Sequence, residues 1–95
     1  MKQPAIYIIS NNYNTVLYIS VTSNLSQRIY QHKEKLVEGF SAKYNLTKLV
    51  YFEQFDEMEN AILREKELKR WRRKYKNELI GKFNPNWKDI YSEII

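Results

Sequence analysis

Two short apolar segments near the start of the chain predict a β-hairpin. Residues 5–10 (AIYIIS) and 16–21 (VLYISV) are rich in isoleucine, valine and tyrosine, which favour extended strands. The segment between them (NNYNT) contains three asparagines, a residue that tolerates the left-handed backbone angles of turns. We therefore predict an antiparallel hairpin with a loop of about five residues. Each strand carries one tyrosine, Tyr7 or Tyr18, which either packs in the core or presents its hydroxyl to a site.

A first helix is predicted directly after the hairpin. Asn24 can cap its first turn, and the apolar residues Leu25, Ile29 and Leu36 recur at helical spacing. Glycine commonly ends helices, so we expect this helix to stop before Gly39. The seven residues that begin with this glycine (GFSAKYN) are expected to form an irregular connection.

A third strand and a long helix follow. Residues 48–55 (KLVYFEQF) have the composition of a strand. From Glu57 towards Ile80 the apolar residues keep helical spacing. We expect this helix to end at Gly81 and to bend near residues 69–71.

The element order predicts one small α/β domain. A loop at residues 84–87 (NPNW) precedes a short closing helix, so the order is ββαβα plus a C-terminal helix. This order predicts a single domain over residues 1–95, with a three-stranded, mainly antiparallel sheet flanked by helices. A hydrophobic content of 43% and a charged content of 28% fit a globular domain.

The composition also excludes several kinds of chemistry and location. The chain has no cysteine, so disulfides, Cys-ligated zinc and thiol nucleophiles are excluded. No segment resembles a signal peptide, and no apolar run approaches the roughly 20 residues that a membrane span needs. We therefore expect a cytoplasmic protein without a membrane partner.

Positive charge is concentrated in the second half of the long predicted helix. The net charge of the chain is +5, and residues 64–76 (REKELKRWRRKYK) hold eight basic residues and two acidic ones. A basic run on a helix is most often a solvated face. The interleaved Trp71 and Tyr75 favour nucleic-acid contact instead, because cations bind phosphates while rings stack on bases or sugars. The residues assigned to this contact are Lys69, Arg70, Arg72, Arg73, Lys74 and Lys76.

Ionisable residues interrupt the apolar faces of both main helices. In the first helix, His32 falls on the stripe of apolar residues, and Arg28 lies at its edge. In the second helix, Glu65 lies near the middle of the inward face. That face consists of Met58, Ala61, Ile62 and Leu68. A buried carboxylate is costly unless it has a partner, so one interpretation is an internal ion pair of Glu65 with Lys69 or with Arg28.

The other interpretation is a site that gathers these groups with the hairpin tyrosines. A single carboxylate is enough for Mg²⁺, which keeps most of its waters and takes further oxygens from phosphate. Arginine matches phosphate geometry and charge, and a tyrosine or a histidine can move a proton. These parts suit phosphodiester hydrolysis with one metal ion. The sequence holds no glycine-rich phosphate loop, paired-acid motif or Ser/His/Asp arrangement.

At these residues the chain resembles the GIY-YIG endonuclease superfamily, in particular small bacterial members similar to the N-terminal domain of the excinuclease C subunit. AIY (residues 5–7) stands where the family has GIY, and YIS (residues 18–20) stands where it has YIG. The segments that follow resemble the family's first helix, third strand and later helices over nearly the whole chain. The ordered series of these short motifs is more specific than any one of them.

The resemblance implies a role for each candidate residue. Tyr7 resembles the tyrosine that helps to activate the attacking water, and Tyr18 resembles the one that orients the site. Arg28 would steady the phosphate, and His32 stands where many members have a histidine or tyrosine in the proton network. Glu65 matches the single metal ligand, which implies one Mg²⁺ or Mn²⁺ ion. DNA is the implied partner, with a repair protein as a further one, and we expect a monomer or a weak homodimer.

Two departures from the signature leave alternatives to cleavage. Ala5 and Ser20 replace the signature glycines, and a side chain can obstruct the close approach that glycine allows. Asn84 and Asn86 lie near the family's late asparagine without aligning cleanly. The leading hypothesis is a metal-dependent endonuclease acting on DNA, for example at branched or damaged structures. The second is a nucleic-acid-binding module of the same fold with weakened catalysis, and the third is a protein-interaction domain.

Overall fold

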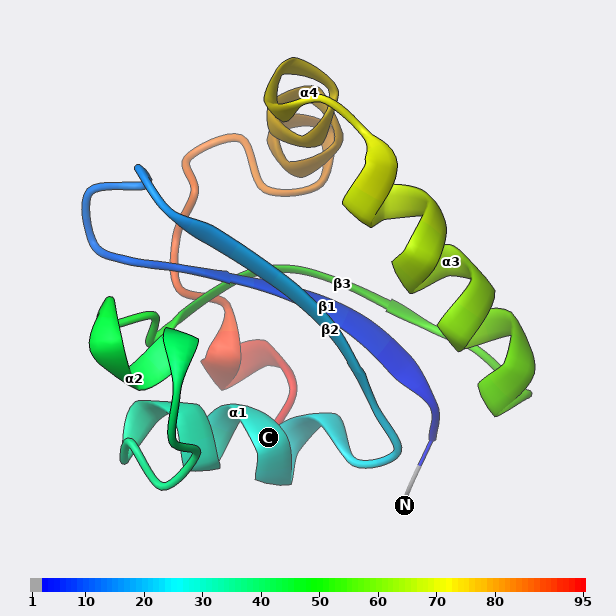
Figure 1. Cartoon of the computed structure of the whole chain (residues 1–95), viewed down its shortest axis with the longest axis horizontal. Coiled ribbons are helices and arrows are strands. Elements are labelled where there is room, and N and C mark those ends of the chain that lie inside the picture. Colours follow the sequence, from blue (N-terminus) through cyan, green and yellow to red (C-terminus); the bar gives the residue numbers. More distant parts are fainter. Residues whose placement is uncertain (1–2) are drawn as a thin grey trace.

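A three-stranded antiparallel sheet lies at the centre of this computed structural model, which describes residues 3–95 (Figure 1). Its strands are β1 (Ala5–Ser10), β2 (Leu17–Thr22) and β3 (Lys48–Gln54), in the order β2-β1-β3. The predicted fold class is confirmed, and the observed bounds of β2 and β3 differ from the predicted ones by one residue. Strand β1 pairs with β2 on one side and with β3 on the other, so β2 lies at one edge of the sheet.

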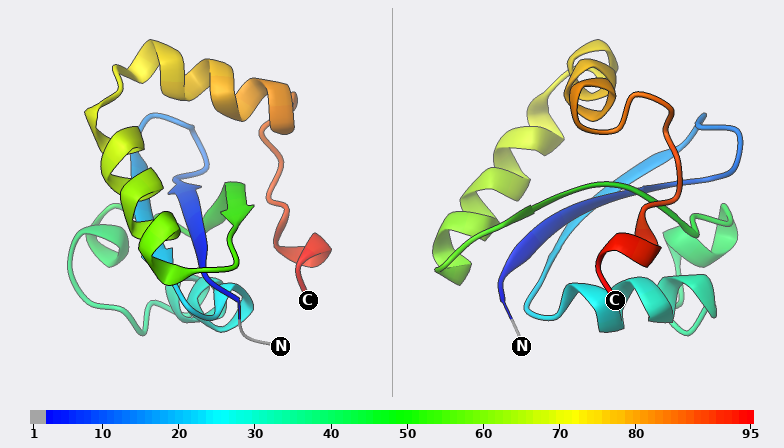
Figure 2. Two further views of the ribbon diagram at one scale, coloured as in Figure 1. Left: turned by 90° about the vertical axis from the view of Figure 1, so that its right-hand side faces the viewer. Right: turned by 180° about the vertical axis from the view of Figure 1, so that it is seen from behind.

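Helices cover both faces of this sheet, as Figures 1 and 2 show. They are α1 (Leu25–Lys33), α2 (Phe40–Lys43), α3 (Met58–Arg70), α4 (Arg73–Phe83) and the 3₁₀ turn η1 (Tyr91–Glu93). Helix α1 and the C-terminal turn pack on one face, whereas α3 and α4 pack on the other. The predicted C-terminal helix is therefore a single turn.

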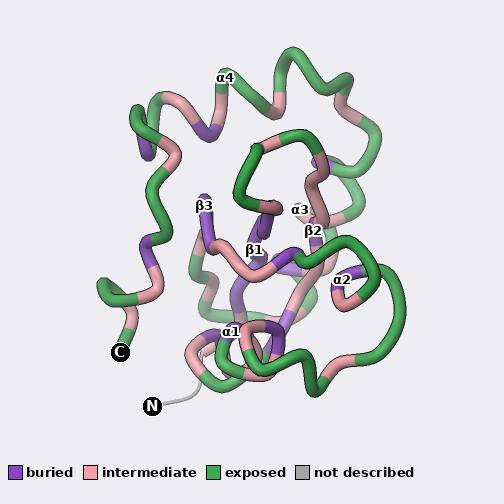
Figure 3. Tube along the Cα trace, turned by 90° about the vertical axis from the view of Figure 1, so that its left-hand side faces the viewer, coloured by how far each residue is buried: buried purple, intermediate pink, exposed green. Residues whose placement is uncertain are grey.

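The central strand β1 is buried along its whole length (Figure 3). Ala5, Tyr7 and Ile9 belong to the core on the α1 face, whereas Ile6 and Ile8 belong to the core on the α3 face. Successive side chains of a strand point to opposite faces, so a strand covered on both sides is apolar throughout. This is why residues 5–9 form one continuous apolar run, which the buried Ser10 ends.

An irregularity in β3 keeps its side chains in step with these two cores. Ile8 pairs with Tyr51 and Ile9 pairs with Leu49, so Val50 is an extra residue on β3. Val50 and Tyr51 both contribute to the core on the α3 face, and Leu49 contributes to the other. A bulge of this kind allows two neighbouring residues to serve one face.

Helix α1 ends earlier than predicted. It stops at Lys33, and Lys35 adopts a positive φ of 55°, with its N–H bonded to the carbonyl of His32. The N–H of Leu36 reaches the carbonyl of Gln31, which completes a Schellman-type end. Leu36 is 66% exposed, so its predicted place on the buried stripe is wrong. The backbone reversal, and not the glycine at position 39, ends this helix.

Three further predictions about helices are wrong. Residues 39–45 are not wholly irregular, because α2 forms within them. The long helix is two helices, since Trp71 and Arg72 adopt extended backbone angles with ψ near 146° and 154°. The expected bend near residues 69–71 is thus a complete break. Helix α4 continues through Gly81, where nothing lies within 4 Å of the position a Cβ would take.

Asn84 joins the end of α4 to the sheet. Its side chain is buried, and its Nδ2 donates to the carbonyl of Val50 at 3.1 Å and to that of Lys88 at 2.8 Å. Its Oδ1 accepts from the backbone N–H of Lys88 at 3.1 Å. Every polar atom of this amide group is therefore engaged in holding the loop after α4 against β3.

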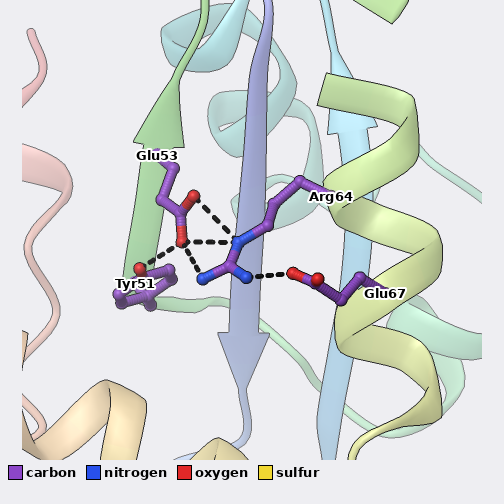
Figure 4. Close-up of polar contacts among 4 residues, drawn as sticks. All are labelled: Tyr51, Glu53, Arg64 and Glu67. Carbon is purple, nitrogen blue, oxygen red and sulfur yellow. Dashed lines mark hydrogen bonds and ion pairs between the residues drawn. The ribbon is translucent and has the colours of Figure 1, made fainter. Parts of the chain in front are cut away.

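A charged network joins α3 to β3 (Figure 4). Arg64 donates from Nε to both carboxylate oxygens of Glu53 at 3.1 Å and from Nη2 to Oε2 at 3.0 Å. Tyr51 donates its hydroxyl to the same carboxylate, and Glu67 pairs with the remaining arm of Arg64. The guanidinium also lies over the ring of Trp71, at 5.3 Å from its centroid. These contacts hold α3 at its place on the sheet.

Candidate active site

A chain of buried hydrogen bonds crosses the interface between β1, α1 and α2. The hydroxyl of Tyr7 lies 2.8 Å from Nε2 of His32, and Nδ1 of His32 lies 3.0 Å from Oγ of Ser41. All three residues are buried, at 0%, 3% and 6% exposure respectively. His32 reaches Tyr7 because it lies one turn beyond Ile29 on the buried stripe of α1. The polar groups that interrupt this core therefore satisfy one another.

Burial controls the protonation of this chain. It raises the pKa of Tyr7 to about 12, although the nearby Ser20 hydroxyl and the Arg28 guanidinium oppose the rise. Burial, assisted by the charge of Arg28, lowers the pKa of His32 to about 4. Both side chains are therefore neutral at pH 7. When Tyr7 donates to Nε2, the proton of the imidazole is on Nδ1 and is donated to Ser41.

Arg28 and Tyr18 complete the group on this face of the sheet. The half-buried Arg28 lies beside Tyr7 and His32, since its charge lowers the pKa of both. Tyr18 pairs with Ile9 in the hairpin, so its side chain is on the Tyr7 face, with its ring centroid 6.1 Å from that of His32. The structure thus brings together four of the predicted site residues: Tyr7, Tyr18, Arg28 and His32.

Glu65 is apart from these four residues. It lies on α3, on the opposite face of the sheet from α1, and its side chain is 15% exposed. Within residues 3–95 it forms an ion pair with Lys69, one turn further on, at 3.2 Å, and none with Arg28. Of the two internal pairs considered from the sequence, the local one is present. The expectation of a single cluster of five residues therefore holds for four of them.

The edge position of β2 connects the two sides. A hollow of about 360 Å³ at this edge is lined by Tyr18 of the first group and by Lys69, the ion-pair partner of Glu65. An edge strand has no neighbour on its outer side, so groups from both faces can meet there around one ligand.

The carboxylate of Glu65 fits one Mg²⁺ ion better than a metal that needs a protein cage. No group of three or more His, Cys, Asp or Glu side chains that could hold a metal occurs among residues 3–95. Mg²⁺ is commonly bound by one or two carboxylates, with waters and substrate phosphates as its other ligands. The ammonium of Lys69 lies 3.2 Å from Oε2 of Glu65, so an ion bound by this carboxylate would share or displace that contact.

The predicted nucleic-acid-binding residues occupy the junction of α3 and α4. Lys69 and Arg70 end α3, Arg72 lies in the break, and Arg73 and Lys74 begin α4. All five are exposed, and Lys76 is half-buried against the hollow at the β2 edge.

Arg73 has a structural contact in addition. Its guanidinium donates to the carbonyls of Asn14 at 2.5 Å and Thr15 at 3.1 Å, and to the side chain of Asn77 at 2.8 Å. It therefore joins α4 to the turn of the β1–β2 hairpin. These contacts leave fewer of its N–H groups available to bind a phosphate than the sequence suggested.

Two partners of the site were missed in the sequence. Ser41 follows His32 by nine residues on a helix that was not predicted, and no local pattern indicates its hydrogen bond. Ser20 was noted only as a departure from the signature. The register of the hairpin pairs Ser20 with Tyr7 across the strands. The predicted five-residue loop would have paired Tyr7 with Ile19, and a shift of one residue changes which side chains share a face.

The family of the chain follows from its comparison with known proteins. The family model described as the GIY-YIG catalytic domain matches residues 3–79, which is most of the chain. The protein belongs to the GIY-YIG family, and the resemblance seen in the sequence is confirmed at this level. It is a nuclease-type domain, and this class binds nucleic acid. Neither the curated proteins nor the solved structures gave a match. No helix in residues 3–95 has the length and apolar character to cross a membrane.

Proposed function

We propose that this protein is a metal-dependent endonuclease that hydrolyses phosphodiester bonds of DNA, with a role in repair or in processing of branched structures. The observation that carries the proposal is the 2.8 Å contact between the Tyr7 hydroxyl and Nε2 of His32, with Arg28 beside it. A buried phenol has a proton acceptor on one side and a phosphate-binding cation near it. Nuclease chemistry needs both.

The proton of the attacking water would pass to this pair. As the water oxygen forms its bond to phosphorus, Tyr7 takes the proton of the water and passes its own to Nε2 of His32. Ser41 accepts the hydrogen bond from Nδ1 throughout and so keeps the ring in place. The bond from phosphorus to the leaving oxygen breaks in the same displacement, and the leaving oxygen takes up a proton from solvent water to become a hydroxyl. The imidazolium next to Arg28 is unfavourable in the free protein and becomes acceptable once the anionic phosphate is bound.

The other site residues would hold the phosphate. Arg28 binds its oxygens and stabilises the charge that develops on them. Tyr18 orients the phosphate from the edge strand. Glu65 would hold one Mg²⁺ or Mn²⁺ ion, which supplies Lewis-acid stabilisation of the phosphoryl oxygens when bound.

Cleavage of single-stranded, duplex and branched DNA with Mg²⁺ or Mn²⁺ tests the proposal. We expect metal-dependent products with the natural protein and none with Glu65→Ala. Glu59→Ala is the matched control, since it removes another carboxylate from the first turn of the same helix. Persistent cleavage by Glu65→Ala would contradict the role of Glu65.

A second candidate, a binding module with weakened catalysis, is favoured by Ser20. This residue faces Tyr7 across the hairpin in the place of a signature glycine. Ala5, by contrast, is fully buried and belongs to the hydrophobic core on the α1 face. Salt-sensitive DNA binding without cleavage in any metal would support this candidate. Cleavage gained by Ser20→Gly would then identify Ser20 as its cause.

A further inference from the structure

A row of three aromatic rings leads outward from the site. The ring of Tyr18 stacks with that of Phe40 at a centroid distance of 6.0 Å and an interplanar angle of 25°. Phe40 in turn contacts Tyr44 at 4.7 Å. Phe40 is 48% exposed and Tyr44 is 40% exposed, so part of each ring is available to a ligand. The row begins in the site and ends on the surface of α2.

The row borders the hollow at the β2 edge. This space of about 360 Å³ falls within the range of roughly 300–1,000 Å³ that is usual for small-ligand sites. It is lined by residues of β2, α2, α3 and α4, namely Leu17, Tyr18, Ile19, Phe40, Lys69 and Lys76. An apolar wall that continues into exposed rings suits a flat, aromatic group.

Three lysines flank this apolar surface. Lys43 lies over the ring of Tyr44, at 5.4 Å from its centroid, and Lys69 and Lys76 line the hollow. Rings that stack on bases, with cations placed for the phosphates between them, are the combination that binds single-stranded nucleic acid. A base inside a duplex already stacks on its neighbours, so its face is not available to such rings.

We propose that Phe40 and Tyr44 bind an unpaired nucleobase next to the scissile phosphate, so that the preferred substrate carries a single-stranded segment at the cut. This inference rests on the proposed function, because it places the phosphate in the Tyr7 site. Tyr18 belongs to both parts: its hydroxyl faces the phosphate and its ring supports Phe40. The lysines bind the phosphates that flank the stacked base.

The test is binding of a single-stranded oligodeoxynucleotide of about 8 nucleotides that carries one 2-aminopurine. Chelator is present, so no cleavage occurs. We expect its fluorescence to fall when the base stacks on the natural protein. Phe40→Ala should weaken binding roughly 5- to 150-fold, the range measured for loss of one base–aromatic stack. Phe40→Tyr keeps an aromatic ring at this position and should show the affinity and the quenching of the natural protein.

Matched variants and a duplex probe separate stacking from other effects. Tyr13→Ala removes an aromatic side chain that is 85% exposed in the hairpin turn, and it should leave binding unchanged. Tyr44→Ala, at the far end of the row, should weaken single-strand binding without disturbing Tyr18. A blunt duplex should bind Phe40→Ala almost as well as the natural protein. Each variant is checked for its fold through the imidazole resonances of His32, the one histidine in the chain.

The outcomes distinguish this inference from the nuclease proposal. Equal binding of the single-stranded probe by the natural protein and Phe40→Ala would overturn the inference. The exposed rings would then be a candidate surface for a protein partner. An equal loss on duplex and single strand would also overturn it. Neither result touches metal-dependent cleavage. Conversely, loss of stacking in Phe40→Ala, with no cleavage by the natural protein, would support the base site and remove the nuclease proposal.

Discussion

Tyr7 and Tyr51 lie on neighbouring strands of the same sheet, point to opposite faces and are both buried, yet their surroundings differ. Burial raises the pKa of both. Tyr51 donates to the carboxylate of Glu53, which raises its pKa further, and the guanidinium of Arg64 offsets only part of this rise. Tyr7 contacts a neutral histidine and lies beside the cation Arg28, which lowers its pKa.

This difference separates a site from a structural brace. A phenol that donates to a carboxylate is held in its protonated form, and its network is closed by Arg64 and Glu67. A phenol between an imidazole and a guanidinium has a route for its proton and a cation that favours the phenolate. The identity of the neighbours, more than the depth of burial, distinguishes the two tyrosines and is the reason why we propose Tyr7 as the reactive one.

The largest expected difference is in catalysis. Tyr7→Phe removes the hydroxyl that exchanges protons with water and His32, so we expect cleavage to fall by about 10²- to 10⁴-fold. Tyr51→Phe removes the matching hydroxyl on the other face, and cleavage should stay close to that of the natural protein. Single-turnover cleavage rates at saturating protein measure both. Equal losses in the two variants would remove the distinction.

The brace should be evident in stability. Arg64→Ala leaves Glu53 without its cationic partner, and we expect the free energy of unfolding to fall by about 1–3 kcal/mol. Glu67→Ala removes the more exposed partner and should cost no more than about 1 kcal/mol. Urea unfolding followed by Trp fluorescence gives both values. A larger loss for Glu67→Ala than for Arg64→Ala would show that Glu53 is not the centre of this network.

Acid should lower the free energy of unfolding through the protonation of His32. The pKa of His32 is about 4 in the folded protein, against an ordinary 6.5, so the unfolded chain binds more protons between these values. Stability is therefore fully present above pH 6.5 and falls as pH drops towards 4, by up to about 1.4 kcal/mol per pH unit. Unfolding at a series of pH values, compared with His32→Gln, isolates this contribution. An unchanged slope in the variant would mean that His32 is not the group responsible.

The smallest effects belong to exposed charges outside both networks. Arg70→Gln and Arg72→Gln should each reduce the salt dependence of duplex binding by about one counterion. Arg73→Gln should change it less, because the guanidinium of Arg73 is bonded to the hairpin carbonyls. Dissociation constants measured over a range of salt concentrations provide the slopes. If the salt dependence changed most in Arg73→Gln, Arg73 would be the main phosphate contact and this prediction would be wrong.

The strands and the family were predictable because their signals are local. Residues 5–9 are apolar without interruption, as expected of a central strand that is covered on both faces, and the two tyrosines stand in short motifs. The apolar spacing of α1 likewise placed His32 on its buried stripe. The ends of helices were less predictable. Gly39 and Gly81 were expected to follow or end the two helices, but α1 ends where the backbone turns at Lys35, and α4 ends at Asn84. A helix can end without glycine when hydrogen-bond partners satisfy its last carbonyl groups.

Local chemistry along the chain is enough to predict the sheet, most of the helical segments and a set of candidate polar residues. Which of those residues meet depends on packing. Tyr7, His32 and Ser41 come from three elements and satisfy one another only because α1 and α2 close over the same face. Glu65 belongs to the other face, and its partner Lys69 lines the hollow at the edge strand β2, next to Tyr18. Periodicity places a side chain on a face of its own element, whereas the partner across the core depends on contacts between residues far apart in the sequence.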